Sequence, residues 1–340
     1  MKFRQTIATT TIVIVLLLLL VITGYGSLFT IRNGGAKVAV FSVPEGVTLR
    51  RISASLREQG LIRSRALFLG AARFVLPEKG IKAGEYIFSP DMSLFDILLT
   101  FKKGEVHYHR ITIPPGYSIS QIGALFEADG LVDARTFKNL TEDKELINLS
   151  GTDAPSLEGF LYPDTYDFIK DGNPKKIVRK MVLRFKEVYG PELEKRASEL
   201  KMSVKDVVTL ASIIEKEAVI DDDRSLISAV FHNRLKKDMP LQSDPTVIYA
   251  LGSSFDGDLR RGDLTLKSSY NTYTTRGLPP GPIASPGIKS IRAALYPADV
   301  DYLYFVSKND DTHYFSSNLK DHNKAVALYQ KSLVSKKTYQ

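Results

Sequence analysis

A long uncharged segment near the N-terminus constrains what this chain can fold into more than any other feature. No residue between Arg4 and Arg32 is charged, and residues 12–22 form an unbroken aliphatic run. A helix needs about 20 apolar residues to cross the hydrocarbon core of a bilayer, and residues 7–31 supply enough of them. We therefore expect residues 1–32 to form a short tip and a transmembrane anchor in the lipid bilayer.

The flanking charges predict the orientation of this anchor. Lys2 and Arg4 precede the apolar run, so the positive-inside rule places the N-terminus in the cytoplasm and the rest of the chain outside. The alternative is a signal peptide that is removed after export. No A-x-A-like cleavage site is present, and Gly24-Tyr25-Gly26 is the nearest substitute. We therefore expect a single-pass protein of the cell (inner) membrane whose body is periplasmic or otherwise extracytoplasmic.

Composition narrows the classes of function. The 340 residues, 44% of them hydrophobic, suffice for two or three domains with real cores. The net charge is +8, but the basic residues are scattered among acidic ones, which argues against nucleic acid as a partner. The chain has no cysteine, which excludes disulfides and thiol chemistry.

An internal repeat organises the first part of the exported body. Residues 41–68 (FSVPEGVTLRRISASLREQGLIRSRALF) match residues 111–137 (ITIPPGYSISQIGALFEADGLVDARTF). Each copy predicts a short strand, a Pro-x-Gly turn, a helix capped by Thr48 or Ser118, a Gly-Leu pair and a second helix.

The segment between the copies completes a small unit. Residues 82–90 predict a strand, and Ser93 is the expected N-cap of a helix from Leu94 to Phe101. The resulting βααβ order near residues 38–105 resembles that of LysM modules, which bind polymers of N-acetylglucosamine. The alternative is a spacer that holds the next domain away from the membrane. We predict a LysM-like module with a partial second copy over residues 38–139.

A polar, turn-rich segment at residues 140–156 marks a predicted domain boundary. The remainder, residues 157–335, predicts one mixed α+β domain, so the fold class expected for the whole chain is α+β with an N-terminal transmembrane helix. The expected helices cover residues 174–189, 191–199, 203–218, 223–237, 288–295 and 320–332, and the expected strands cover residues 302–307 and 313–315.

The densest chemical signal lies between Leu210 and Gly287. An apolar helix that begins after Ser203 ends in Glu215 and Glu217, and the loops that follow are rich in Ser, Asp, Thr, Tyr, Asn, Gly and Pro. Acidic groups beside neutral polar loops suit a large uncharged substrate such as a glycan. They suit a metal ion or a nucleotide poorly.

A helical wheel separates the two acids. Glu215 and Glu217 lie about 160° apart around the axis, on the two flanks of the buried face. They therefore cannot form the closely facing carboxylate pair of a retaining glycosidase. Glu217 lies closer to the apolar centre, where desolvation raises the pKa of a carboxyl and lets it hold a proton for general-acid catalysis. The remaining polar side chains are predicted on the opposite face: Lys205, Thr209, Ser212 and Lys216. The alternative for either glutamate is a surface ion pair, with Lys216, Arg224 or Arg234 as partner.

Several long motifs in this region occur in a fixed order. They read EGFLYPDTY, SIIEKEA, FHNRL, LQSDPTVIY, YNTYTTRGLPPGPIASPG, YLYF and HYFSSNLKDHNKAV. This series resembles the YceG/MltG family of endolytic murein transglycosylases, which are membrane-anchored enzymes that cut nascent peptidoglycan. The resemblance covers nearly the whole chain, and it implies that residues 157–335 are a transglycosylase catalytic domain.

The resemblance implies a reaction and its residues. The expected enzyme is a lyase that cleaves the β-1,4 bond between MurNAc and GlcNAc and leaves a 1,6-anhydro-MurNAc end. The family's catalytic glutamate lies in the Glu-Lys-Glu element, which implies Glu217, with Glu215 as the fallback. One carboxyl suffices as acid and then as base, so no metal or cofactor is required. Neutral donors would hold the substrate, and the nominated residues are Gln242, Asp244, Tyr249, Asn271, Tyr273 and Asn323.

Two other functions remain open at this point. One is a non-catalytic protein that binds peptidoglycan as a scaffold, and the other is a hydrolytic muramidase. Peptidoglycan glycan strands are the expected partner in all three cases, and the resemblance suggests cell-wall synthases as further partners.

Overall fold

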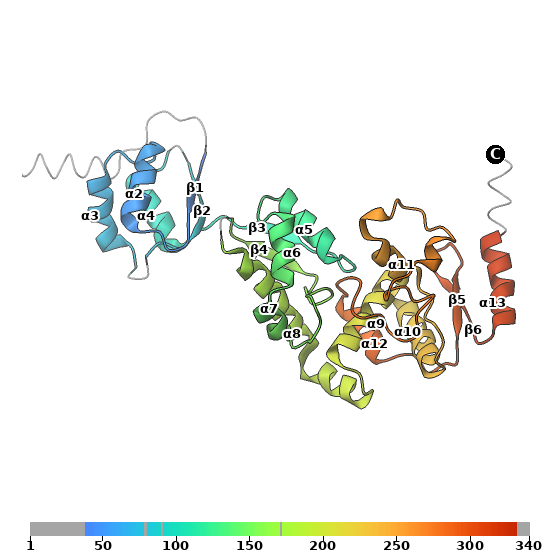
Figure 1. Ribbon diagram of the computed structural model, residues 1–340. Helices are drawn as coiled ribbons and strands as arrows, with labels where there is room; N and C mark the ends of the chain where they lie inside the picture. The colour runs from blue at the N-terminus through green and yellow to red at the C-terminus, as the bar shows by residue number, and fades with distance from the viewer. Residues whose placement is uncertain (1–37, 78–79, 90, 171, 332–340) are drawn as a thin grey trace, which may run out of the picture. The chain divides into compact units, whose positions relative to one another are not determined.

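The computed structural model of the chain describes residues 38–77, 80–89, 91–170 and 172–331 (Figure 1). The membrane anchor predicted at residues 7–31 lies outside the described residues. None of the helices in the described ranges is long and apolar enough to span a bilayer.

The chain divides into two compact units. The N-terminal unit contains the residues up to Arg110 together with Asp167–Asn173, and the C-terminal unit contains Ile111–Tyr166 together with the residues from Pro174 onward. The division after Arg110 falls within the predicted range 38–139. The three predicted domain ranges themselves stay predictions.

The N-terminal unit is built around a two-stranded antiparallel sheet. Strands β1 (Ala39–Val43) and β2 (Gly84–Phe88) pair, and helices α2 (Leu49–Glu58) and α3 (Arg65–Val75) lie between them in the sequence. Helix α4 (Leu94–Lys103) follows. The buried face of the sheet packs on helical residues in a core of aromatic rings, in which Phe101 meets Tyr86 edge-on at 4.7 Å between ring centroids. The strand–helix–helix–strand order predicted from the sequence is therefore present.

The predicted repeat is also present at the level of secondary structure. Its second copy contains β3 (His109–Thr112), α5 (Ile119–Ala128) and α6 (Ala134–Thr141). The side chains of Thr48 and Ser118 accept hydrogen bonds from the third residue of α2 and of α5, as predicted for N-caps. The glycines of the two Gly-Leu pairs share a left-handed φ of 67°, a conformation that glycine adopts without a steric penalty.

The C-terminal unit is mostly helical, with short strands, so the coarse expectation of an α+β fold is confirmed. Strand β4 pairs with β3, and β5 pairs with β6. The remaining elements are α7 (Lys144–Ser150), β4 (Thr165–Phe168), α8 (Pro174–Glu199), α9 (Val204–Glu217), α10 (Asp221–Lys236), α11 (Asp244–Leu251), α12 (Ile288–Leu295), β5 (Tyr304–Ser307), β6 (His313–Ser316) and α13 (Leu319–Val326).

Some local predictions hold and others fail. The break between two helices at residues 189–191 is confirmed, because Gly190 has non-helical dihedral angles inside α8. The predicted turn-rich boundary at residues 140–156 instead contains α7, which Asp143 caps. Helix α11 is missing from the sequence-based prediction, because it has only 8 residues and buries only two of them.

Helix α9 is the centre of the C-terminal unit. Helices α8, α10, α11 and α12 all contact it, and α12 makes the most extensive contact (Figure 1). Every residue from Val207 to Ile214 is buried, as expected for a helix surrounded by protein. The prediction that Thr209 and Ser212 face away from the core is wrong. Both are covered, and the Ser212 hydroxyl accepts a hydrogen bond from the Ile283 N–H at 3.0 Å.

Gly159 provides a test of this packing. Its φ is +83°, and a Cβ placed there would lie 2.9 Å from Cγ1 of Val208 in α9 and closer still to Pro282. We expect Gly159→Ala to lower the free energy of unfolding by roughly 2–4 kcal/mol, from the left-handed backbone together with overpacking. Urea unfolding, followed by tyrosine fluorescence because the chain has no tryptophan, measures this loss.

Gly151 is the matched control. It has a similar φ of +79°, but a Cβ placed there would have nothing within 4 Å. Gly151→Ala should cost only the backbone penalty of about 1 kcal/mol. Equal losses in the two variants would contradict the close approach of residue 159 to α9.

Candidate active site

The last residue of α9 is a glutamate that the fold partly buries. A capping box of Ser203 and Asp206 starts the helix, and the chain becomes extended at Ala218. Glu217 therefore lies at the C-terminal end of the helix, where the macrodipole disfavours a negative charge. Burial raises the pKa of Glu217 from 4.5 to about 7, and the negative charge of Asp244 adds to this shift.

A serine hydroxyl is the hydrogen-bond partner of this carboxyl. Ser243 donates to Oε1 of Glu217 at 2.5 Å. This bond lowers the pKa of Glu217, so it opposes part of the effect of burial. None of the described residues donates to Oε2 in the same way, which leaves that oxygen as the place for a transferable proton.

The Ser243 hydroxyl does not form the hydrogen bond that an N-cap serine usually makes. Ser243 is the N-cap residue of α11, yet its hydroxyl caps none of that helix's N–H groups. The residue is buried, and its backbone N–H donates to Thr272 Oγ1 at 2.9 Å while its carbonyl accepts from Thr246 Oγ1 at 2.7 Å. These bonds fix the backbone on both sides, so the hydroxyl is held toward Glu217.

Glu215 has a different environment. Its Oε2 accepts from the N–H of Gly287, the N-cap residue of α12, at 2.9 Å, and its Oε1 pairs with Arg224 at 3.3 Å. Both partners of this ion pair are largely buried. Glu215 therefore pairs with Arg224, one of the partners named for a surface ion pair, but the pair is largely buried and not at the surface. The two acids bind different segments, in agreement with their predicted separation around the helix.

Two of the nominated substrate-binding residues lie together beside Ser243. Asp244 is exposed at the start of α11 and accepts from the Tyr273 hydroxyl at 2.5 Å. Burial and the carboxylate of Asp244 raise the pKa of Tyr273. The charge of Asp244 raises the pKa of Glu217, and the charge of Glu217 contributes to the raised pKa of Tyr273.

Gln242 adjoins the cluster but has its own partner inside the protein. Its φ is +53°, in the left-handed region that non-glycine residues rarely adopt. The side-chain oxygen of Gln242 accepts from Arg234 at 3.0 Å, and its N–H donates to the carbonyl of Thr272 at 3.0 Å. The residue itself remains exposed.

Asn271 and Asn323 differ from the other nominated residues. Asn271 is fully buried, and its amide donates to the carbonyls of Leu264 and Leu266 while its oxygen accepts from the N–H of Tyr273. The geometry therefore gives it the task of shaping the loop that carries Tyr273. Asn323 is exposed on α13, and within the described ranges no hydrogen bond joins it to Glu217 or Ser243.

Tyr249 is hydrogen-bonded to a second buried acid, Glu158, which the sequence did not lead us to nominate. Its hydroxyl donates to Glu158 at 3.2 Å, and the other oxygen of Glu158 accepts from the N–H of Ile119 at the start of α5. Burial raises the pKa of Glu158 to about 7. The ring of Tyr249 also contacts Tyr270 at 4.9 Å between centroids. The motif EGFLYPDTY, which begins at Glu158, was the available signal for this group.

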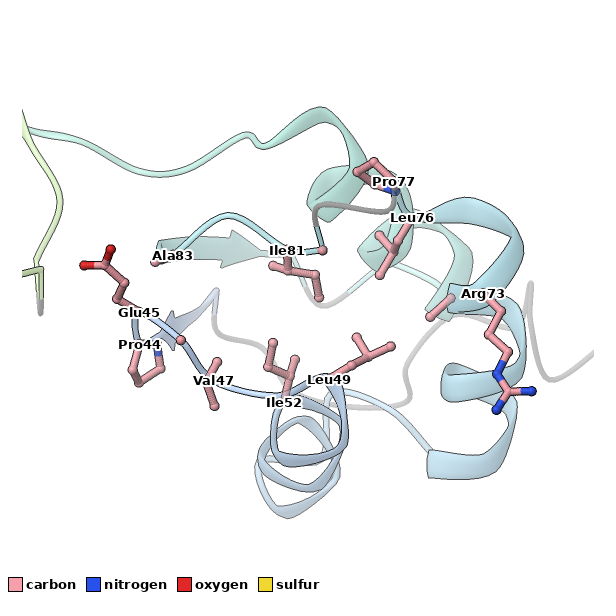
Figure 2. A pocket seen from close by; sticks show the side chains of 13 residues that line it. Pro44, Glu45, Val47, Leu49, Ile52, Arg73, Leu76, Pro77, Ile81 and Ala83 are labelled. Atoms are coloured by element: carbon pink, nitrogen blue, oxygen red, sulfur yellow. The ribbon is translucent and has the colours of Figure 1, made fainter.

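A pocket of about 610 Å³ lies in the N-terminal unit. It is bordered by the turn between β1 and α2, the end of α3 and the approach to β2, and apolar side chains form most of its walls (Figure 2). Glu45 and Arg73 supply charges at opposite ends of it (Figure 2). Its apolar walls contain Val47, Leu49, Ile52, Leu76 and Ile81.

The raised pKa of Glu217 predicts a pH-dependent cost to stability. The folded state keeps this proton up to about pH 7, whereas the unfolded state loses it near pH 4.5. Stability therefore falls as pH rises through this window, because the folded state binds more protons there. We expect Glu217→Gln to raise the free energy of unfolding by up to roughly 3 kcal/mol at about pH 8 and by little at acidic pH.

Urea unfolding of both proteins at about pH 5 and about pH 8 measures this difference. Glu215→Gln is the comparison, because it breaks a largely buried ion pair and should lose stability at about pH 8. A Glu217→Gln variant that is less stable than the parent at about pH 8 would contradict the desolvation of this carboxyl.

Comparisons with known proteins identify the family of this chain. Residues 41–328 match the model of the YceG-like family. The chain is similar to a protein of Bacillus subtilis (strain 168) named endolytic murein transglycosylase, with 35% identity over 85% of this chain and 84% of that protein. A protein of the same name from Streptococcus pneumoniae serotype 2 is 29% identical over 90% of this chain, which spans 61% of the streptococcal protein.

A solved structure is similar as well. A crystal structure of a putative YceG-like protein from Listeria monocytogenes has a TM-score of 0.59 and 34% identity, covering 85% of this chain and 99% of that one. The family match covers most of the chain, and the relative from B. subtilis exceeds 30% identity over most of both proteins. This chain therefore belongs to the YceG-like family.

Proposed function

We propose that this protein is an endolytic murein transglycosylase, a lyase that acts on the glycan strands of peptidoglycan. Its membership of the YceG-like family and the name carried by its relatives support this activity. The proposed mechanism rests on the carboxyl of Glu217. This group is partly buried, accepts a hydrogen bond from Ser243 and has a pKa raised to about 7.

The first step of the proposed reaction is a proton transfer. Glu217, protonated on Oε2, donates to the oxygen that links C1 of MurNAc to C4 of GlcNAc. The C1–O bond breaks, GlcNAc leaves with a free 4-hydroxyl, and positive charge develops at C1. A carboxyl with a pKa near ambient pH suits this task, because it is protonated in a large fraction of molecules and still a useful acid.

The second step regenerates the acid. The carboxylate of Glu217 takes the proton of the C6 hydroxyl of MurNAc, and O6 forms a bond to C1, which closes the 1,6-anhydro ring. No water is consumed, and Glu217 ends protonated as it began. Ser243 supports both steps, since its hydroxyl remains bonded to Oε1 and stabilises the charged form between them.

The surroundings of Glu217 favour one acid over a pair. Glu215 is occupied by Arg224 and the N–H of Gly287, and both oxygens of Glu158 accept hydrogen bonds from the protein. Asp244 is the exposed acid beside the cluster. In a hydrolytic muramidase this residue would be the candidate to activate water, so the products must be identified to separate the two reactions.

The substrate-binding assignments remain part of the proposal. We assign direct contact with the sugars to exposed or partly exposed side chains, namely Asp244 and Tyr273 beside Glu217, and Tyr249 on α11. Gln242 and Asn271 act mainly by shaping the loops, given their internal hydrogen bonds. Asn323 is retained as a more distant candidate.

The rest of the chain would bring this site to its substrate. We propose that residues 7–31 anchor the protein in the cell membrane, with residues 157–335 outside as the catalytic domain and cell-wall synthases as neighbours. We also propose that the LysM-like βααβ segment near residues 38–105 binds glycan. The pocket bordered by the β1–α2 turn, the end of α3 and the approach to β2 supports that role, since apolar side chains with a few charges are typical of small-molecule sites.

The products of strand cleavage test the activity. The full chain in detergent, incubated with uncrosslinked glycan strands, should release fragments with anhydro-MurNAc ends, identified by mass spectrometry. Glu217→Gln should lower the rate by roughly 100- to 10,000-fold, the range for loss of a general acid–base group. The value of kcat/KM should fall as pH rises above about 7, because the acid must be protonated.

Three outcomes would overturn parts of this assignment. Reducing MurNAc ends would indicate a hydrolytic muramidase, and binding without release would indicate a scaffold. Loss of activity in Glu215→Gln with activity retained in Glu217→Gln would exchange the roles of the two glutamates.

A matched pair of variants tests glycan binding by the N-terminal unit. Ile81→Asp puts a charge in the wall of the pocket, and Val40→Asp puts the same charge on an exposed strand residue. We expect Ile81→Asp to weaken cosedimentation with glycan strands by about tenfold, since an unpaired charge in an apolar wall is costly, while Val40→Asp binds normally. Equal binding by both variants would argue for the spacer role.

A further inference from the structure

Arg234 on helix α10 is a buried cation with an unusual set of partners. It is 93% buried, since only 7% of its surface is exposed. Among the residues that the structure describes, no acidic side chain pairs with it. Its guanidinium instead donates to uncharged oxygens, and this burial lowers the pKa of Arg234. A buried charge without a counter-ion lowers stability, so the hydrogen bonds of Arg234 need a functional explanation.

Most of those bonds end on one short segment. Nη1 of Arg234 lies 3.0 Å from the carbonyl oxygen of Pro240, from that of Leu241 and from the side-chain oxygen of Gln242. Nε donates to the carbonyl of Leu303 at 2.7 Å, which ties the same side chain to the approach to β5. A single guanidinium thus forms hydrogen bonds to three successive residues, 240–242, which lead into Ser243.

The backbone of residues 240–242 is strained at Gln242. Gln242 has a φ of +53°, and a non-glycine residue in this region costs about 1–2 kcal/mol unless its surroundings impose it. The hydrogen bond from Arg234 to the Gln242 side chain and the bond from the Gln242 N–H to Thr272 are the contacts that impose it. The strain lies directly before the residue that bonds to Glu217.

We propose that Arg234 is a positioning residue for the reaction: it holds residues 240–242 so that the Ser243 hydroxyl is aimed at Glu217. The inference rests on the proposed function of Glu217. Lysine cannot replace arginine in this role, because its single ammonium nitrogen cannot bond to residues 240–242 and to the Leu303 carbonyl at once, as Nη1 and Nε of Arg234 do. The ring of Tyr304, 5.1 Å from the guanidinium, covers its face and keeps it in place.

A double-mutant cycle tests this role. Arg234→Lys keeps the charge and removes the guanidinium, and Ser243→Ala removes the hydroxyl that Arg234 is proposed to aim. Each single variant, made in the full chain, should lower kcat by about tenfold to a hundredfold with little change in KM. The double variant should be no slower than the slower single variant, because both changes break the same contact.

The pH profile provides a readout that a purely structural defect would not move. The Ser243 bond favours the charged form of Glu217, so its loss raises the pKa that governs the alkaline limb of kcat/KM. The side chains of Asp244, whose charge acts on Glu217, and of Tyr273 are unchanged in these variants. Both single variants should shift this limb upward by the same amount, and the double variant should shift it no further.

Two further variants make the test decisive. Arg276→Lys is the matched control, because Arg276 is an exposed arginine that also donates to a backbone carbonyl, that of Asp238 on the same connection; it should keep normal kcat and an unshifted profile. Gln242→Ala removes one acceptor of Arg234 and should give the same upward shift even if Arg234→Lys does not fold.

The outcomes separate the proposed function from the proposed role of Arg234. A parent protein that releases no anhydro ends defeats the proposed function. An active parent in which the effects of Arg234→Lys and Ser243→Ala multiply, or in which neither Arg234→Lys nor Gln242→Ala shifts the alkaline limb, defeats the role of Arg234 alone.

Discussion

The proposed catalytic arrangement depends on a single helix whose middle is buried. Helix α9 is covered on all sides from Val207 to Ile214, and its last residue, Glu217, is partly buried. Burial together with the C-terminal end of the helix dipole disfavours a negative charge at that point. The same packing that stabilises the C-terminal unit thus supplies the site with a carboxyl that keeps its proton near neutral pH.

The C-terminal unit also contains features that lower its free energy of unfolding. A second acid, Glu158, is also buried with a pKa raised to about 7, Gln242 is held in a left-handed conformation, and Arg234 is buried without an acidic partner among the described residues. Each lowers stability, and all three lie on the segments that hold Ser243 or Tyr249. This concentration is typical of sites where stability is sacrificed for a fixed geometry.

Much of the fold could be predicted from the sequence because the signals are local. Thr48, Ser93, Ser118 and Ser203 all cap the helices that they were expected to start, since capping depends on a side chain and the N–H groups that follow it. The rotation of 100° per residue separated Glu215 from Glu217. The prediction failed where distant segments decide: Thr209 and Ser212 are both buried, and Ser212 is covered by the segment of Ile283, which lies far away in the sequence. Ser243 was missed because an N-cap serine ordinarily bonds to its own helix, and only tertiary contact redirects it to Glu217. The partners of Arg234 and Asn271 are likewise mostly backbone groups, which carry no sequence signal.

The central claim is that Glu217 keeps a proton near neutral pH with Ser243 as its hydrogen-bond partner. Infrared titration measures this directly through the carboxyl band that is present in the parent protein and absent in Glu217→Gln. The account predicts a midpoint at about pH 7 that moves upward in Ser243→Ala. A midpoint near 4.5, the ordinary value for glutamate, or a midpoint that Ser243→Ala leaves unchanged, would contradict it.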